Sequence, residues 1–467
     1  MEKWLELDLQ KYWQLQEEGK LTSRELCAWY LERIARYDGH YRTILEINPD
    51  ALFIAEAMDR ERKLGKKRSI LHGVPILLKD SISTYDGLHT SAGSLALKDH
   101  FAKDDAFIVK RLREAGAVIL GKSNMTELSH YTSNKMKNGY SARGGQVLHP
   151  YNEKSSPSGS STGSSVAVSL NFSLLALGTE TKGSVIWPSH NSSIVGIKPS
   201  RGLVSRSGII PICRAHDTAG PMARTVADCA HLLGALSGED PKDPSTWALD
   251  DKRGDYAGFL EKEALKGMRL GIRKTNFGPE EEKLFEEAVK TMEDLGAIFK
   301  GPYDLPEVGR DDLVILAHEF KRSFDHYLHE YSGSKKLLEE IVLYNKENTD
   351  LIYGQDLLEG ALEIGDRLLD SDYLDKRINL AQDKRQEIED LMDKEELDLI
   401  VFPGRSDLPS VSGLPCIVVP CGYTRDNRPL GISFIARNFD EGLMIAGAYS
   451  FEQASVKRKP PLVKEEK

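Results

Sequence analysis

Hydrophobic and polar positions along the chain predict helices and short buried strands in succession. Thr22 begins a Thr-x-x-Glu capping box with Glu25, and apolar residues then recur at helical spacing, which predicts an amphipathic helix. Residues 73–80 are apolar up to Lys79 and Asp80, too few for a helix and introduced by glycine and proline, so they predict a short buried strand. Residues 104–115 predict an amphipathic helix that runs into an apolar strand at 116–121. A helix, turn and strand in this order are typical of α/β proteins.

Two turns rich in glycine and serine bracket the next helix and strand. Residues 154–165 have the composition of a flexible linker, yet they run directly into an apolar segment at Val166. An apolar strand follows at 174–178, and the second turn occupies 179–184. Because apolar segments flank both turns, we expect them to lie inside the core.

The pattern changes from about 240 to 395, where long charged amphipathic helices such as 280–295 and 375–392 dominate. We interpret this region as a helical layer or cap. Strand-like segments then return, before a last helix near 441–454 and a charged tail; these segments are 397–402, 416–420 and 431–435.

These elements predict one large domain over 1–467, although this length would also permit two or three domains. The core would comprise about 65–235 and 395–461, with the helical layer at 240–395 and N-terminal helices at 1–66. Both ends of the chain contribute strands to this core. Neither end would complete it alone, which favours one domain over two.

Charge and composition exclude several classes of protein. A net charge of −10 and a pI near 5.7 disfavour a surface that neutralises phosphates, so we expect no nucleic-acid partner. The N-terminus carries acidic residues where a signal peptide needs an apolar core, and no segment reaches the ~18 apolar residues of a membrane span. We therefore expect a cytoplasmic protein, a monomer or homodimer, with a small-molecule or peptide partner and no membrane partner.

Cysteine and histidine spacing gives no sign of a disulfide framework or a metal site. The twelve histidines lack an HExxH or similar ligand pattern, so we expect no metal and no other cofactor. The cysteines are odd in number, lack CxxC spacing and are expected to be reduced core residues; they are Cys27, Cys213, Cys229, Cys416 and Cys421.

Lys79 and the two serine-rich turns are the candidates for chemistry. Amide hydrolysis without a metal needs a nucleophile, a base and donors for the developing oxyanion. A lysine can accept a serine proton only when desolvation lowers its pKa from ~10.4 towards roughly 7 to 8. A buried strand would desolvate Lys79, and Asp80 would point to the opposite face. A lysine at a strand end is more often an ordinary residue whose charged end reaches solvent. The hypothesis of a catalytic Lys79 therefore depends on its occurrence together with the two serine-rich turns.

Taken together, these motifs resemble the amidase signature family. The resemblance covers most of the chain, and is densest over 71–233 and recognisable again over 397–461. The matching elements are Gly-Val-Pro-x-x-x-Lys-Asp at 73–80, Gly-Lys-x-Asn-Met at 121–125, the glycine/serine loop at 159–164, the family's Gly-Thr-Asp-x-Gly-Gly-Ser element at 178–184, Gly-Ile-Lys-Pro at 196–199 and the run at 217–228.

The resemblance implies a catalytic role for three residues. Lys79 would be the base, Ser184 the nucleophile, and Ser160, held on a cis peptide, would pass the proton between them. It also implies one α/β domain with a mixed, mostly parallel twisted sheet of about eleven strands covered by helices. The oxyanion hole would be formed by backbone N–H groups of Thr181, Lys182 and Gly183.

The segment Ser141–Gln146 resembles the peptide amidase branch of this family, as do Glu180 and the pair 185–186. That branch removes ammonia from the carboxamide end of peptides. One alternative is the glutaminase subunit of a transfer-RNA amidotransferase, against which the segment 141–146 argues. A second alternative is a binding protein that has kept the serine-rich loops and lost catalysis.

Three positions depart from the family pattern: Ser81, Thr162 and Lys182. Lys182 adds a charge two residues before Ser184. Its side chain would either extend to solvent or point into the site, where it would crowd the acyl group. From crowding in a tight turn we expect Lys182→Gly or Lys182→Asp to raise turnover on neutral peptide amides.

Overall fold

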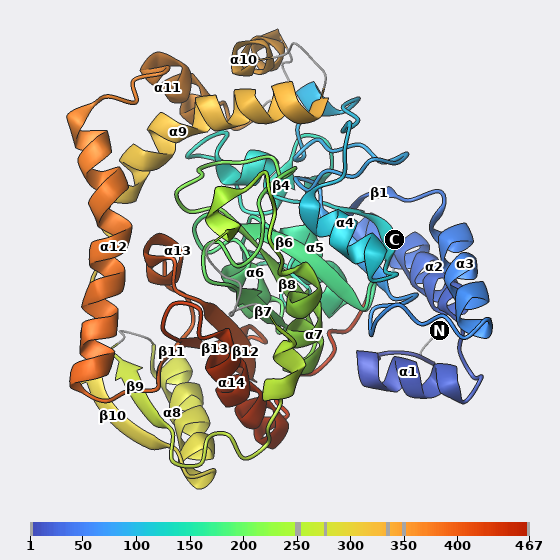
Figure 1. Cartoon of the computed structure of the whole chain (residues 1–467), viewed down its shortest axis with the longest axis vertical. Coiled ribbons are helices and arrows are strands. Elements are labelled where there is room, and N and C mark those ends of the chain that lie inside the picture. The colour runs from blue at the N-terminus through green and yellow to red at the C-terminus, as the bar shows by residue number, and fades with distance from the viewer. Residues whose placement is uncertain (1–2, 248–253, 275–277, 333–336, 348–351, 465–467) are drawn as a thin grey trace.

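An eleven-stranded mixed sheet runs through the centre of the molecule (Figure 1). The computed structural model describes residues 3–247, 254–274, 278–332, 337–347 and 352–464. The strand order is β1-β3-β2-β6-β8-β7-β12-β13-β11-β9-β10. The strands are β1 (Ile44–Ile47), β2 (Pro75–Lys79), β3 (Val118–Ser123), β6 (Leu175–Glu180), β7 (Val195–Lys198), β8 (Thr218–Ala223), β9 (Arg269–Arg273), β10 (Ile298–Tyr303), β11 (Leu399–Pro403), β12 (Cys416–Tyr423) and β13 (Pro429–Ile435).

The sheet is mixed, as expected, but it is not mostly parallel. Parallel pairs occur where β3 joins β2, β2 joins β6, and β9 joins β11 and β10. All other neighbours, from β6 through β8, β7, β12 and β13 to β11, and β1 with β3, are antiparallel. The reason is the connections: helices α4 (Phe107–Glu114) and α8 (Pro279–Asp294) cross between parallel strands, whereas a short turn joins β12 to β13.

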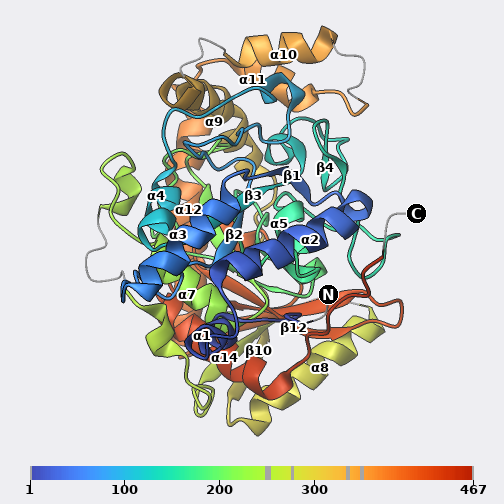
Figure 2. The ribbon, with the colours of Figure 1, turned by 90° about the vertical axis from the view of Figure 1, so that its right-hand side faces the viewer.

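Three helices open the chain and pack on one side of the sheet, where Figure 2 shows them in blue: α1 (Leu9–Glu17), α2 (Ser23–Tyr41) and α3 (Ala51–Lys63). The capping box predicted at Thr22 is present, because the Thr22 side chain accepts from the Glu25 N–H and Glu25 accepts from the Thr22 N–H. The sequence therefore predicted the start of α2 correctly.

Both glycine/serine turns lie in the core, as predicted. Helix α5 (Thr162–Ser169) begins within the first turn, and every one of its residues is buried. Strand β6 then leads into the second turn, which ends at the short helix α6 (Ile186–Asn191). Residues 157–165 of a segment with the composition of a linker are thus part of the packed interior, whereas 154–156 lie at the surface.

The helical layer lies beside the sheet (Figure 1), and its buried side chains form one hydrophobic cluster with residues of β11, β12 and β13. It contains the helices α9 (Asp311–Tyr327), α10 (Leu338–Glu347), α11 (Asp356–Ile364) and α12 (Ser371–Lys394), with a π-helical turn η5 (Leu328–Ser332) after α9. The region 240–395 also contains β9 and β10, two strands that the sequence pattern did not predict.

The C-terminal strands β12 and β13 lie in the middle of the sheet order, between β7 and β11. The short helix α13 (Leu408–Ser412) precedes them, and α14 (Glu441–Ser455) follows. Arg458 near the C-terminus pairs with Glu6 near the N-terminus at 2.7 Å. Within the described residues no helix combines the length and apolarity that a bilayer crossing requires. All five cysteines are buried.

Candidate active site

Lys79 is the last residue of β2 and is fully buried. Its Nζ lies 2.7 Å from Ser160 Oγ, 2.8 Å from Thr179 Oγ1 and 3.2 Å from the Thr179 carbonyl oxygen. A neutral amine has two hydrogens to donate and one lone pair. All three oxygens can accept from a Lys79 ammonium; an uncharged Lys79 could keep the two donations to Thr179 and accept from the Ser160 hydroxyl through its lone pair.

Burial lowers the pKa of Lys79 to about 7, against the attraction of Asp217 and Glu180, which raises it. Asp80, the next residue, is not among the carboxylates that raise the Lys79 pKa. Its carboxylate accepts hydrogen bonds from the Ser91 hydroxyl and the Gly93 N–H, on the other face of the strand. The alternation predicted from the sequence thus separates the two side chains.

The two candidate serines differ in accessibility. Ser160 follows a cis peptide bond after Gly159 and has no exposed surface, whereas Ser184 is 7% exposed. The Ser184 carbonyl accepts from the Ser161 N–H at 3.1 Å, which holds the two serine turns together. Of the pair, only Ser184 has exposed surface.

The turn that carries Ser184 is held by Glu180 and by a residue from the far end of the chain. The Glu180 carboxylate accepts from the N–H groups of Val185 and Ile186 at 2.7 and 3.0 Å, and from Ser410 Oγ at 2.6 Å. The Gly183 N–H donates to Ser410 Oγ at 3.2 Å. Ser410 lies in α13, so this helix fixes the turn through one hydroxyl.

Only glycine fits at position 183. Its φ is +77°, a left-handed conformation, and a Cβ there would lie 2.4 Å from the Trp187 ring. This turn therefore has one backbone shape, which is what oxyanion donors require.

Asp217 connects the same turn to the segment before β8. One carboxylate oxygen accepts from the Thr181 hydroxyl at 2.5 Å, and the other accepts from the N–H groups of Ile212 and Cys213, each at 2.9 Å. Burial raises the Asp217 pKa to about 6, so the carboxylate is charged above that pH.

Lys182 neither extends into open solvent nor points at Ser184. Its Nζ lies 2.8 Å from Asp312 in the first turn of α9 and 3.2 Å from Asp407, which precedes α13. The Asp312 side chain has no exposed surface, whereas that of Lys182 is 24% exposed. Burial lowers the Lys182 pKa, but the two carboxylates outweigh it and hold the pKa above its ordinary value. The ammonium thus ties the turn to the helical layer.

The segment Ser141–Gln146 is part of the scaffold around β2. Arg143 pairs with Glu46 at 2.7 Å and lies 3.8 Å from Asp80. Ser141 donates to the Asn124 side chain at 2.7 Å. The segment spans the short strands β4 (Tyr140–Ser141) and β5 (Gly145–Gln146), and these contacts are structural.

Sequence reasoning missed the residues that support this site. Thr179 lay within a recognised motif, so its contact with Lys79 could have been anticipated from its position. Ser410, Asp312 and Asp407 gave no local signal, because each is more than a hundred residues from the turn that it contacts. No group of three or more histidine, cysteine, aspartate or glutamate side chains within the described ranges is arranged to hold a metal ion.

Comparison with known proteins gives a consistent result. The family model described as Amidase matches residues 25–410. A probable amidase of Arabidopsis thaliana is 42% identical over 466 residues, covering 95% of this chain and 89% of the relative. A glutamyl-tRNA(Gln) amidotransferase subunit of Alkaliphilus metalliredigens is 30% identical, and the match covers 93% of each chain.

Solved structures are similar over the whole chain. Native peptide amidase from Stenotrophomonas maltophilia has a TM-score of 0.93 and 36% identity, with 99% of both chains covered. An amidase family protein from Bacillus anthracis has a TM-score of 0.94 and 37% identity, covering 99% of this chain and 93% of its own.

Proposed function

This chain belongs to the amidase family and is an amide-hydrolysing enzyme, and we propose that it works through an acyl-enzyme formed on Ser184, with Lys79 as base and Ser160 between them. The observation that carries this proposal is the environment of Lys79. It is a fully buried amine with a pKa of about 7 whose Nζ lies 2.7 Å from a serine hydroxyl. Such a lysine accepts a proton at neutral pH, which an ordinary lysine does not.

In the first half of the reaction, Ser184 Oγ attacks the carboxamide carbon. Its proton passes to Ser160 Oγ as the Ser160 proton passes to Lys79 Nζ. The carbonyl oxygen becomes an oxyanion stabilised by N–H groups of the turn 181–183. The C–N bond then breaks, the nitrogen takes the proton back through Ser160, and ammonia leaves.

In the second half, water attacks the acyl-enzyme and its proton follows the same route to Lys79. The tetrahedral intermediate collapses, Ser184 recovers its proton, and a carboxylic acid is released. Among the proposed oxyanion donors, the Gly183 N–H already donates to Ser410 at 3.2 Å. The N–H groups of Thr181 and Lys182 are therefore the better placed to serve the substrate.

For the substrate, we favour the carboxamide end of peptides. The similarity to the peptide amidase of Stenotrophomonas maltophilia over nearly the full length supports this choice. A glutaminase subunit of a transfer-RNA amidotransferase is the second candidate, supported by relatives at 30% identity. A homologue that only binds amides is the third, and the geometry around Lys79 argues against it.

The test uses the purified full chain without partner subunits. We expect ammonia release from a peptide amide, weak or no release from free glutamine, and covalent labelling by a fluorophosphonate. Ser184→Ala should abolish labelling and lower kcat on the order of 10⁴-fold or more, with the fold intact by circular dichroism. Labelling that persists in Ser184→Ala would place the nucleophile elsewhere. Release from glutamine alone would favour the amidotransferase role.

A further inference from the structure

A cavity of about 420 Å³ lies beside the turn that carries Ser184. Thr179, which contacts Lys79, and Thr181, which precedes Ser184 by three residues, both line it. This volume is within the range of small-molecule sites. A substrate whose carboxamide lay at Ser184 would therefore have room for one neighbouring group in this cavity.

The lining of the cavity is mixed, and its apolar part comes from two segments. The segment 209–212 supplies Ile210 and Ile212, and α9 supplies Tyr327. These three side chains belong to buried residues that are only 3–6% exposed. Tyr327 stacks on Tyr331 with ring centroids 5.5 Å apart, so the wall on the side of the helical layer is aromatic.

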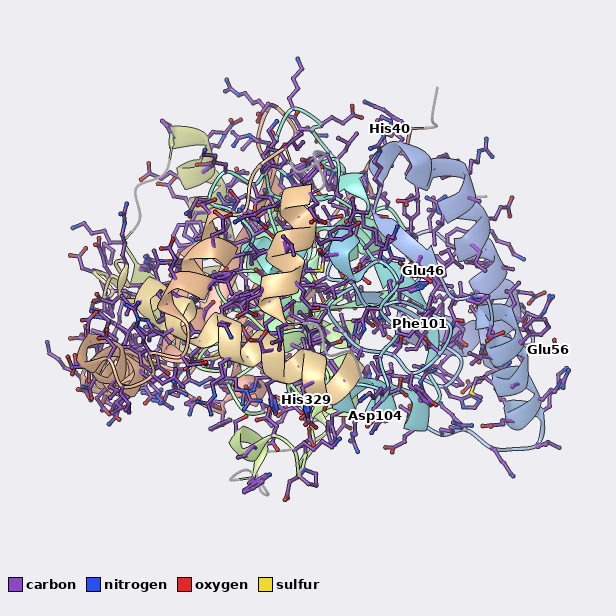
Figure 3. The ribbon with its side chains drawn as sticks, turned by 90° about the horizontal axis from the view of Figure 1, so that it is seen from above. His40, Glu46, Glu56, Phe101, Asp104 and His329 are labelled. Carbon is purple, nitrogen blue, oxygen red and sulfur yellow. The ribbon has the colours of Figure 1, made fainter. Side chains whose placement is uncertain are left out.

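The rim of the cavity is charged and exposed. It includes Arg214, Lys242 and Glu330, which carry both signs. Lys242 at the rim lies 3.8 Å from Asp104. Figure 3 labels Asp104 and, near it, His329 of η5. A polar chain that left the cavity would cross this rim into solvent.

We propose that the inner end of this cavity binds the side chain of the residue that carries the carboxamide, and that it selects large apolar or aromatic side chains. The remainder of the peptide extends across the charged rim. This inference rests on the proposed function. It names the class of substrate that the site prefers: peptide amides that end in residues such as leucine or phenylalanine.

The same geometry disfavours an acidic side chain. Two charged groups line the inner part of the cavity. Arg206 is paired with Asp243 at 2.6 Å, which offsets its charge, whereas Asp217 is charged above a pH of about 6 and would repel an aspartate or glutamate side chain. For apolar side chains, each methylene removed from water contributes a preference of roughly fourfold. Phenylalanine amide should therefore exceed alanine amide by about 10- to 100-fold in kcat/KM.

The experiment measures ammonia release by the purified chain from N-acetyl amides of glycine, alanine, leucine, phenylalanine and aspartate. We expect kcat/KM to rise from glycine to phenylalanine and to be lowest for aspartate. Equal values across the apolar series, or a preference for aspartate, would overturn the subsite while leaving the amidase function intact. No hydrolysis of any of these amides would instead count against the proposed function.

Two variants locate the preference within the cavity. Ile210→Phe fills the inner end and should lower the ratio of phenylalanine amide to glycine amide at least tenfold. Ile212→Ala removes part of the wall and should lower the same ratio about threefold or more. The matched control is Leu313→Phe, an exposed position on α9 outside the cavity, which should leave the ratio unchanged. A ratio unchanged in both cavity variants would overturn the proposal.

Discussion

The turn at 179–184 and the helical layer of α9–α12 meet at the same site, but they are built in different ways. Every residue of the turn except Lys182 is buried, and Ser184, the proposed nucleophile, belongs to a short sequence motif. The layer is more open: Leu369 and Ile378 are 89% and 66% exposed. It contacts the site through a few side chains, among them Asp312 and Tyr327. The reacting groups therefore depend on short motifs, whereas their surroundings depend on long-range contacts.

Lys79 tests the enclosed half of this comparison and should show the largest effect. We expect wild-type kcat/KM to rise with pH through one ionisation near 7, because only neutral Lys79 accepts a proton. Lys79→Met should lower activity on the order of 10³-fold or more and abolish this ionisation. A double variant that combines Lys79→Met with Ser160→Ala should lose little more activity than Lys79→Met alone, since Lys79 and Ser160 are proposed to act as one proton-transfer unit. Steady-state kinetics from pH 5 to 9 would measure this.

Measuring the stability of the Lys79→Met variant distinguishes two roles for Lys79, a catalytic base and a structural cation. The folded pKa of about 7 lies below the unfolded value of ~10.4, so between these values the unfolded chain binds a proton that the folded chain does not. Wild-type stability should therefore decrease as pH falls from 10 to 7, and Lys79→Met should lack this decrease. A variant that loses stability yet keeps normal activity per folded molecule would identify Lys79 as structural.

Lys182 tests the contact between the two regions and should show an intermediate effect. From the sequence we expected Lys182 variants to raise turnover by relieving crowding. Because Asp312 and Asp407 hold the Lys182 ammonium, we now expect these variants to lower turnover. Lys182→Asp places a third carboxylate beside these two and should lower kcat by about 10- to 100-fold, because it displaces the turn that bears the proposed oxyanion donors. Lys182→Gly should cost less. Kinetics on a neutral peptide amide would measure both.

A matched lysine serves as the control for Lys182. Lys321 on α9 also contacts two carboxylates, Asp325 at 2.8 Å and Glu339 at 3.4 Å, and Lys321 lies outside the site. Lys321→Asp should lower the melting temperature while kcat per folded molecule stays unchanged. Higher turnover in well-folded Lys182→Gly and Lys182→Asp would show instead that the side chain obstructs the substrate.

Asp217 should show the smallest effect, seen mainly in the pH profile. Its carboxylate attracts the Lys79 ammonium and raises the Lys79 pKa. Asp217→Asn removes that attraction, so the ionisation of Lys79 should move to lower pH by a fraction of a unit to about one unit. We expect only a several-fold loss of kcat from the changed contact with Thr181. A midpoint that stays or moves to higher pH would contradict this account.

The sequence predicted the elements that carry the proposed reacting groups better than the residues that support them. Strand β2, both glycine/serine turns and the start of α2 follow from apolar runs and a capping box, which are signals within about ten residues. Strand β10 gave no such signal, because it is a partly exposed edge strand that contains proline. Ser410 contacts Glu180 across 230 residues of sequence, and no local pattern encodes such a contact.

The prediction of a mostly parallel sheet was wrong for a related reason. The family resemblance and the helix between β2 and β3 both favoured parallel strands. Parallel or antiparallel order, however, is set for each pair by the connection between its strands. The pairs that join β7 to β12 and β6 to β8 depend on where long connections return to the sheet, which local hydrophobic patterns do not specify.

The placement of β12 and β13 between β7 and β11 has a consequence for how the protein is made. During synthesis, Lys79, Ser160 and Ser184 leave the ribosome long before the strands that complete the middle of the sheet. Ser410, which holds Gly183 and Glu180, follows more than two hundred residues after the turn. A nascent or truncated chain that ends before α13 therefore carries all three proposed catalytic residues without the helix that fixes their turn, so we expect activity only once α13, β12 and β13 have been made.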